Sequence, residues 1–238
     1  MANIKEAHIL LSGSITDCQA RIAKREAQRG DTWPTYDRDF TAYMVDFSSV
    51  VNGVVLLRQL DRIQSPVVID LMSSTDAVAS LFMDLGKTDG LGIAVGRRDN
   101  REICQKERDK SLGIHQIAGD LFEGKTWVEI KKILAGRVAN LIMEDGALAW
   151  DFAPVDKRFY GLMLNRLWNL LSASGGVLLA ETPTAEELAS AGVNMPMWRD
   201  MLLRDRIDFD YADLELNKGG LLRLRKTPDS PLQLPLLQ

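Results

Sequence analysis

The sequence has 238 residues, of which 46% are hydrophobic and 26% charged, as expected for a globular protein built around one large core. Its formal net charge of -4 argues against a nucleic-acid partner, which would need a basic surface. No apolar run approaches the roughly 18 residues of a membrane span, and the first residues lack the pattern of a signal peptide. We therefore expect a cytoplasmic protein that makes no contact with membranes.

Short spacings between metal-binding residue types are missing from the sequence. Cys18 and Cys104 lie far apart, as do the two histidines, His8 and His115. The sequence therefore predicts no metal site. Two isolated cysteines in this setting are expected to stay reduced.

The first 65 residues carry helical patterns only. A first helix is expected over residues 14–30, because the pattern stops at Gly30. Residues 37–63 place apolar side chains at steps of three and four, which predicts one helix with one apolar face. That face would consist of Phe40, Tyr43, Met44, Phe47, Val50, Val51, Val54 and Leu57. We expect residues 1–65 to form a helical cap that closes over the remainder, residues 66–238.

After Pro66 the pattern alternates between short apolar runs and amphipathic stretches. The runs, expected to be strands, are residues 67–71, 90–96, 114–120, 138–146 and 175–182. The amphipathic stretches, expected to be helices, are residues 75–86, 97–113, 126–136, 157–175, 184–192 and 195–205. Strands that alternate with helices predict right-handed crossovers and a mostly parallel sheet covered on both faces.

The end of the chain changes character. Residues 207–217 and 219–227 alternate apolar and polar side chains, with a shift of phase at Ala212-Asp213, and the turn signal Asn217-Lys218-Gly219-Gly220 connects them. This pattern predicts an antiparallel hairpin. The fold class is therefore α/β: seven strands, mostly parallel, with helices on both faces, a C-terminal antiparallel hairpin and an N-terminal helical extension.

Five strand–helix units closed by a hairpin resemble the class I S-adenosylmethionine-dependent methyltransferases, which have a Rossmann-like fold. The resemblance runs from about Pro66 to Pro228, roughly two-thirds of the chain, and has four motifs. Asp70 ends the first strand, where the family has an acidic residue. Gly119-Asp120 resembles the adenine motif after the third strand. Glu144-Asp145 follows the fourth strand, in the family's active-site segment, and Gly175-Gly176 resembles the entry to the fifth.

The resemblance implies a site at the carboxyl ends of these strands. S-adenosylmethionine would be the cofactor. The implied cofactor-binding residues are Asp70, Met72, Ser73, Ser74, Thr75, Asp99, Asp120 and Leu121. Glu144 and Asp145 would act near the methyl acceptor, where one of them could take a proton or hold an amine. Structural alternatives stay open, because Asp70 or Asp120 could bond loop amides, and Glu144-Asp145 could form a solvated turn.

Two departures from the family pattern concern the cofactor. The glycine-rich turn after the first strand is replaced by residues 72–76, "MSSTD". The second strand ends in Gly96, where the family has an acidic residue that holds the ribose, and Asp99 follows three residues later. S-adenosylmethionine has no phosphate, so small hydroxyl side chains could hold its amino-acid tail without glycine. The same segment could equally be a helix cap.

The most consistent interpretation is methyl transfer from S-adenosylmethionine to a small-molecule acceptor by in-line displacement. The alternative is a non-catalytic protein that keeps the fold as a binding or interaction module. A nicotinamide-dependent oxidoreductase fits less well, because the G-x-G-x-x-G motif is missing and a hairpin ends the sheet. A homodimer is compatible with the sequence.

Overall fold

The computed structural model describes residue 20 and residues 38–71, 73–144, 156–213 and 220–237. Its strands are β1 (Val67–Leu71), β2 (Leu91–Gly96), β3 (Ile114–Ala118), β4 (Leu141–Glu144), β5 (Val177–Thr182), β6 (Asp208–Asp213) and β7 (Gly220–Arg225). Its helices are α2 (Phe40–Asp46), α3 (Gly53–Asp61), α4 (Asp76–Asp84), α5 (Ile103–Ser111), α6 (Gly124–Leu134), α7 (Lys157–Leu170), α8 (Ala185–Ser190) and α9 (Met195–Arg204), with a 3₁₀ turn over Phe47–Ser49.

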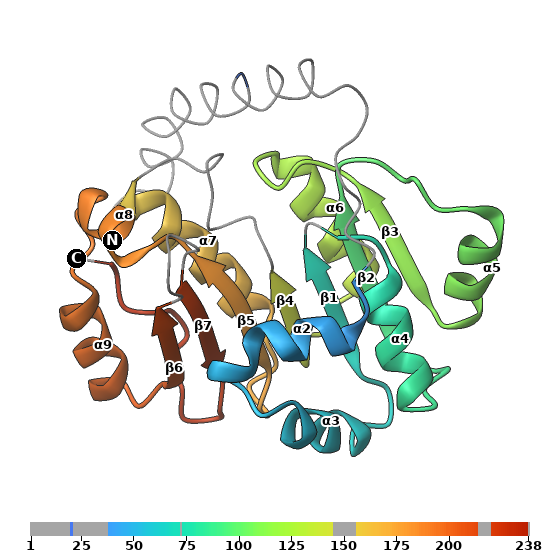
Figure 1. Ribbon diagram of the computed structural model, residues 1–238, viewed down its shortest axis with the longest axis horizontal. Coiled ribbons are helices and arrows are strands. Elements are labelled where there is room, and N and C mark those ends of the chain that lie inside the picture. The colour runs from blue at the N-terminus through green and yellow to red at the C-terminus, as the bar shows by residue number, and fades with distance from the viewer. Residues whose placement is uncertain (1–19, 21–37, 72, 145–155, 214–219, 238) are drawn as a thin grey trace.

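All seven strands form one sheet in the order β3-β2-β1-β4-β5-β7-β6 (Figure 1). The first five strands in this order pair in parallel, and β7 is antiparallel to both β5 and β6. The predicted mostly parallel sheet with its C-terminal antiparallel pair is therefore confirmed. Most of the predicted turn between the last two strands, at residues 217–220, lies outside the described residues.

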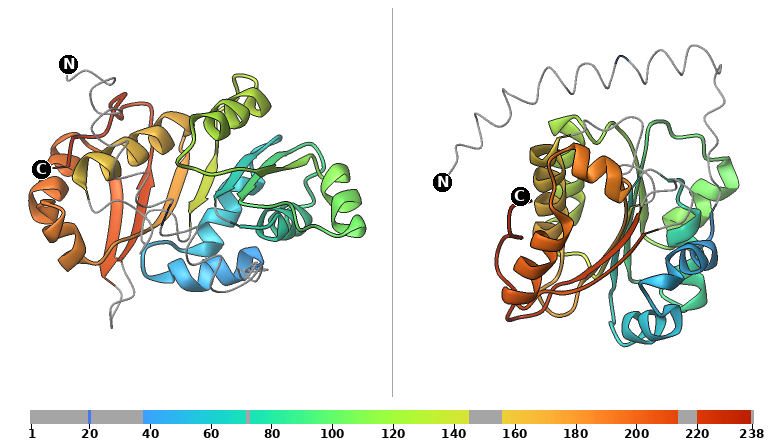
Figure 2. Two further views of the ribbon diagram at one scale, coloured as in Figure 1. Left: turned by 90° about the horizontal axis from the view of Figure 1, so that it is seen from above. Right: turned by 60° about the vertical axis from the view of Figure 1, so that its left-hand side comes forward.

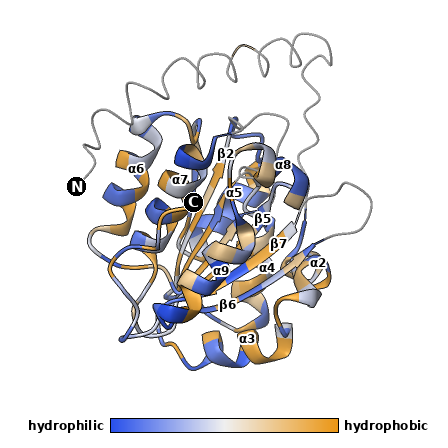
Figure 3. Ribbon diagram, turned by 90° about the vertical axis from the view of Figure 1, so that its left-hand side faces the viewer, coloured by the Kyte–Doolittle hydropathy of each residue, from blue (hydrophilic) through white to orange (hydrophobic). Residues whose placement is uncertain are grey.

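Helices cover both faces of the sheet (Figure 2). Side chains alternate along each strand, so Val68 packs into a cluster with α2, α3 and α4, while Ile69 packs into another with α6, α7 and α9. Inner strands such as β2 and β5 are correspondingly apolar over most of their length (Figure 3). This burial on both faces explains why the first strand reads as an unbroken apolar run.

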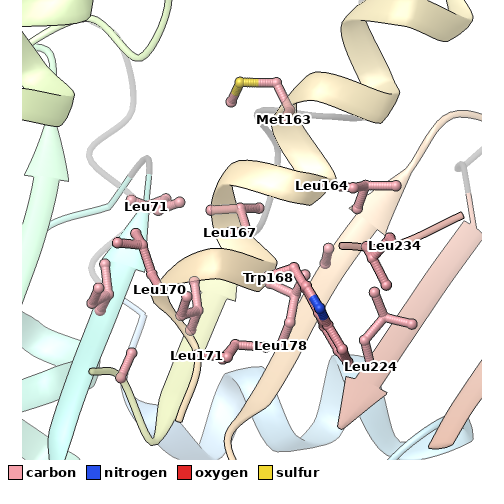
Figure 4. Close-up of a cluster of buried hydrophobic side chains, with 14 of the residues drawn as sticks. Leu71, Met163, Leu164, Leu167, Trp168, Leu170, Leu171, Leu178, Leu224 and Leu234 are labelled. Carbon is pink, nitrogen blue, oxygen red and sulfur yellow. The ribbon is translucent and has the colours of Figure 1, made fainter. Parts of the chain in front are cut away.

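Trp168 on α7 and Trp198 on α9 are the two largest fully buried side chains in the second cluster, and Trp168 lies against the sheet. Leucines from α7, β5 and β7 surround its ring (Figure 4). Its indole nitrogen donates to the carbonyl of Pro231 at 3.0 Å, and Nζ of Lys226 lies 5.2 Å from the ring centre. One side chain therefore fixes both the helix and the chain that follows β7.

The prediction of a single helix over residues 37–63 is wrong. The chain leaves the helix after Asp46, passes through the 3₁₀ turn and begins α3 at Gly53. Asn52 caps this second helix, because its Oδ1 accepts from the amide of Val55 at 3.1 Å. Val54, predicted on the apolar face, is consequently 58% exposed.

The helix predicted over residues 97–113 also begins later, at Ile103. Glu102 and Gln105 form a capping box there, which fixes the start of α5. Among the described residues, no helix is long and apolar enough to cross a membrane.

Candidate functional site

The strand order reverses between β1 and β4. From β1 the chain continues to β2 and β3 on one side, and later to β4 and β5 on the other. In open α/β sheets, ligands bind outside the carboxyl ends of the strands at such a reversal. Leu71 and Glu144 are paired at these two strand ends, so the residues around them form the candidate site.

Asp70 is the titratable group at the centre of this position. Its side chain is fully buried, and its two oxygens accept hydrogen bonds from the Tyr43 phenol at 2.9 Å and from the Ser73 hydroxyl at 2.7 Å. Burial raises the pKa of Asp70 to about 7, and the two hydrogen bonds and the charge of Arg38 offset this effect only in part. The carboxyl can therefore gain or lose a proton near neutral pH.

Tyr43 comes from α2, within the predicted cap. Burial raises the pKa of its phenol well above the ordinary value, and the neighbouring Asp70 carboxylate raises it further. The phenol therefore stays protonated and acts as a permanent donor to Asp70. The apolar spacing of residues 37–63 predicts a buried Tyr43, but nothing in that spacing indicates the bond to Asp70.

A second set of charges lies on the same face of the sheet. Arg38 pairs with Asp46 at 2.9 Å, and the charge of Arg38 also acts on Glu181 near the end of β5. Burial raises the pKa of Glu181, whereas Arg38 lowers it. The segment around α2 thus brings one cation close to carboxylates on two different strands.

Glu144 lies on the opposite face of the sheet from Asp70. It pairs in register with Leu71, whose side chain belongs to the cluster under α6 and α7, and paired residues share a face. Glu144 is 1% exposed, so it is a buried carboxyl and not part of a solvated turn. Asp145, its predicted partner, lies outside the described residues.

The loop after β1 satisfies its own hydroxyl groups. Ser73 donates to Asp70, Ser74 donates to Asp76 at 3.0 Å, and Thr75 donates to Asp109 at 2.6 Å. A cofactor tail would therefore have to use the remaining lone pairs of these oxygens or displace an internal bond. Met72, the other predicted contact in this loop, lies outside the described residues.

Asp109 is the anchor of this loop. The carboxylate is fully buried on α5 and accepts from Thr75, from Arg101 at 2.9 Å, and from Arg108 at 2.8 Å. Arg108 also reaches Asp76 at 2.8 Å. Three donors therefore converge on this buried carboxylate, one from the loop after β1 and two from residues 101–108.

The end of β2 is crowded by the same loop. The Ser73 amide donates to the Val95 carbonyl at 3.2 Å, and a Cβ on Gly96 would lie 3.2 Å from the Ser73 carbonyl and 3.1 Å from the Gln116 amide nitrogen. This approach explains why glycine ends the strand. Asp99 is engaged by Arg101 at 2.8 Å, which lowers the pKa of Asp99 to about 2.

Asp120 and Leu121 follow β3. Oδ1 of Asp120 accepts from the Phe122 amide at 2.8 Å, and its carbonyl accepts from Thr126 at 2.6 Å. Leu121 is buried in the core, and its carbonyl accepts from the Trp127 indole at 2.8 Å. The segment is thus held rigidly at the carboxyl end of β3.

The predicted site residues fall into two groups. Asp70, Ser73 and Ser74 come together through the Ser73 hydroxyl, and Thr75 follows in the same loop. The others have separate partners or positions: Asp99 is bound by Arg101, Asp120 and Leu121 follow β3, and Glu144 lies on the opposite face of the sheet from Asp70. No group of three or more histidine, cysteine, aspartate or glutamate side chains suited to a metal occurs within the described ranges.

No protein-family model matches the sequence, and no curated protein matches it. Among solved structures, a ribosomal RNA methyltransferase of Plasmodium falciparum aligns with a TM-score of 0.50 and 9% identity, over 85% of this chain and 100% of that one. An rRNA methylase of Clostridium thermocellum aligns with a TM-score of 0.46 and 11% identity, over 74% and 97%. An O-methyltransferase of Thermotoga maritima aligns with a TM-score of 0.41 and 11% identity, over 80% and 72%.

At sequence identities of 9–11% the similarity concerns the fold alone. Of these three alignments, only the first, with a TM-score of 0.50, supports the fold assignment. Together with the strand order and the terminal antiparallel pair, it shows that this chain has the Rossmann-like fold of the class I S-adenosylmethionine-dependent methyltransferases. The fold expected from the four sequence motifs is therefore confirmed.

Proposed function

We propose that this protein binds S-adenosylmethionine at the carboxyl ends of β1, β2 and β3 and transfers its methyl group to a small molecule. The observation that carries this proposal is the fold itself, with a buried, titratable Asp70 at the reversal of strand order. Such positions bind ligands in open α/β sheets. A strongly perturbed carboxyl there is typical of functional sites.

The residues at the different strand ends would have different roles, some in binding the cofactor and others in orienting the acceptor. Asp70, which accepts from Ser73, would fix the loop that holds the cofactor tail. Asp120, in the segment that resembles the family's adenine motif, would accept from the adenine amine with its remaining lone pairs. S-adenosylmethionine would supply an activated methyl carbon, and the sulfur keeps the electron pair as a neutral thioether when that bond breaks. Glu144 or Asp145 would orient the acceptor nucleophile and receive its proton. Orientation of the two reactants is the main contribution of the protein.

Calorimetric titration with S-adenosylmethionine and S-adenosylhomocysteine, with NAD as a control, tests the cofactor. Micromolar binding of the first two and no binding of NAD is the expected result. Asp120→Ala should weaken this binding by about tenfold, equivalent to roughly 1.4 kcal/mol, whereas Asp84→Ala, an exposed carboxylate on α4, should leave it unchanged. Absence of binding by both sulfur compounds would refute the proposal.

The acceptor is tested separately. Glu144→Gln should reduce turnover while cofactor affinity stays the same; equal loss of both would place Glu144 in the cofactor site or the core. A screen of small-molecule acceptors should include an rRNA fragment, the acceptor class in the name of the Plasmodium falciparum structure. If the RNA is methylated and no small molecule is, the proposal of a small-molecule acceptor is wrong, whereas the proposal that S-adenosylmethionine is the cofactor stands.

A second candidate function is a non-catalytic interaction module. The observation that favours it is the loop after β1, where Ser73, Ser74 and Thr75 already donate inside the protein, with glycine at the end of β2. A protein that had lost its cofactor would keep such internal bonds for stability. The titration described above separates the two functions.

A further inference from the structure

The free edge of β3 forms a groove that the proposed methyl transfer does not use. The strand is the last in the sheet, and within the described ranges nothing pairs with its outer side (Figure 1). Four consecutive residues, Gly113, Ile114, His115 and Gln116, line a cavity of about 920 Å³. Because neighbouring side chains in a strand point to opposite faces, a lining of consecutive residues means that the cavity opens onto the strand edge itself.

Two helices form the rims of this groove, one on each face of the sheet. Arg101, Lys106 and Lys110 line it from α5 and the preceding loop. From α6 it is lined by Lys125, Val128, Glu129, Lys132 and Ile133. The α6 residues follow helical spacing, and the opposite face of that helix, with Trp127 and Ile130, is buried. The groove therefore carries five cationic side chains and one acidic one.

Some of this positive charge is already compensated. Arg101 pairs with Asp99 and Asp109, and Lys125 pairs with Glu123 at 2.6 Å. Lys110 and Lys132, one on each rim, take part in none of the ion pairs of the described residues. Both are exposed. An acidic ligand in the groove would therefore meet an uncompensated cation on either side.

We propose that this groove binds an extended acidic peptide, which adds to β3 as a further strand. An unpaired strand edge offers regularly spaced backbone donors and acceptors, and strand addition to such an edge is a common mode of peptide recognition. Side chains of the added strand would alternate between the two rims, so acidic residues at both odd and even positions would meet lysines. Val128, 68% exposed, offers an apolar contact.

Two features favour a peptide over a nucleic acid. The lining contains no phenylalanine, tyrosine or tryptophan on which bases could stack. The unpaired edge of β3 offers backbone carbonyls as well as amides, and a peptide backbone has N–H groups to pair with these carbonyls, whereas a phosphodiester backbone has none.

Binding is measured by fluorescence anisotropy with a labelled peptide of about eight residues, glutamates interrupted by two valines, a length that spans the strand. The charge-reversal variants Lys110→Glu and Lys132→Glu should each weaken binding by about tenfold or more. The matched control is Lys131→Glu, which changes an exposed neighbour on α6 outside the groove and should alter affinity little.

A second comparison separates strand addition from simple charge attraction. The same peptide, N-methylated at alternate residues, keeps its charge but loses backbone donors, and it should bind much more weakly. Bound peptide should also slow hydrogen exchange of the Ile114 and Gln116 amides. Equal binding of the N-methylated peptide, or no binding of either, would overturn the proposal.

Short single-stranded RNA and DNA serve as competitors. If either binds more tightly than the peptide and loses affinity in Lys110→Glu, the groove is a phosphate site and the proposal is wrong. Peptide binding in the groove does not depend on methyl transfer. Titrating the same variants with S-adenosylmethionine therefore shows whether a substitution affects only the peptide site or also the proposed cofactor site. Unchanged cofactor binding with lost peptide binding is the expected combination.

Discussion

The phenol oxygen of Tyr43 lies 2.9 Å from Oδ1 of Asp70, 27 residues further along the chain. Both groups are buried, and α2 thereby supplies a donor to the end of β1. The hydrogen bond joins the predicted N-terminal cap to the candidate site. Any change in the protonation of Asp70 therefore acts directly on the contact between these two parts of the chain.

Removal of this donor should destabilise the protein. Tyr43→Phe leaves a buried carboxyl with one hydrogen bond fewer, so the free energy of unfolding should fall by about 1–3 kcal/mol. The loss should be larger at pH 8, where Asp70 is ionised, than at pH 5. Urea unfolding at both values measures it. Tyr211→Phe is the control, because that phenol donates to Asp213 at the surface and its loss should cost less.

Asp70 itself should make the stability depend on pH. Its pKa is about 7 in the folded protein and 3.8 ordinarily, so the folded state holds the proton more tightly than the unfolded chain. The stabilisation of the folded state by protonated Asp70 is fully present below pH 3.8 and is lost as the pH rises through about 7. The corresponding change in the free energy of unfolding is about 4 kcal/mol.

Asp70→Asn should remove this dependence, because an amide does not titrate in that range. Unfolding curves between pH 4 and pH 8 compare the variant with the wild type. Asp84→Asn, at an exposed position on α4, should retain the wild-type slope. A slope that persists in Asp70→Asn would show that another group titrates.

The sheet could be predicted from the sequence because its signals are local. Apolar runs such as residues 67–71 separated by amphipathic stretches identify strands and helices one by one, and right-handed crossovers then order them. The break between α2 and α3 could not be predicted in this way, because the local apolar spacing gives no sign of it. The apolar spacing continues through Val50 and Val51, and only the side-chain cap from Asn52 reveals a new helix.

The candidate site was only partly accessible from the sequence. Asp70 and Asp120 could be found because a strand end is recognisable locally. Tyr43 and Asp109 could not, since their partners, Asp70 and Thr75, lie 27 and 34 residues away. Contacts of this kind arise from the packing of helices on the sheet, which spacing alone does not specify.

Loss of the Asp109 carboxylate should be severe. Asp109→Ala would leave the guanidinium groups of Arg101 and Arg108 partly unpaired and free the Thr75 hydroxyl. Breaking a buried ion pair from one side costs about 3–5 kcal/mol. Glu107→Ala, an exposed carboxylate on the same helix, should cost little. Thermal unfolding of both variants tests this, and equal melting temperatures would contradict a central role for Asp109.

Introducing an acidic side chain at the end of β2 should also destabilise the protein. A Cβ at Gly96 would already lie 3.2 Å from the Ser73 carbonyl, and the carboxylate of Gly96→Asp would need still more room beside that oxygen. We expect a loss of about 1–3 kcal/mol, typical of overpacking. Gly124→Asp is the control, because nothing lies within 4 Å of a Cβ there.

The double variant Gly96→Asp/Gln116→Ala separates the two contacts. Truncation of Gln116 removes the amide that lies 3.1 Å from the new Cβ, whereas the Ser73 carbonyl belongs to the backbone and cannot withdraw. If the loop after β1 is the obstacle, the double variant should recover little of the loss, measured against Gln116→Ala alone. Full recovery would mean that the amide was the obstacle, and that the loop leaves room for an acidic side chain at this position.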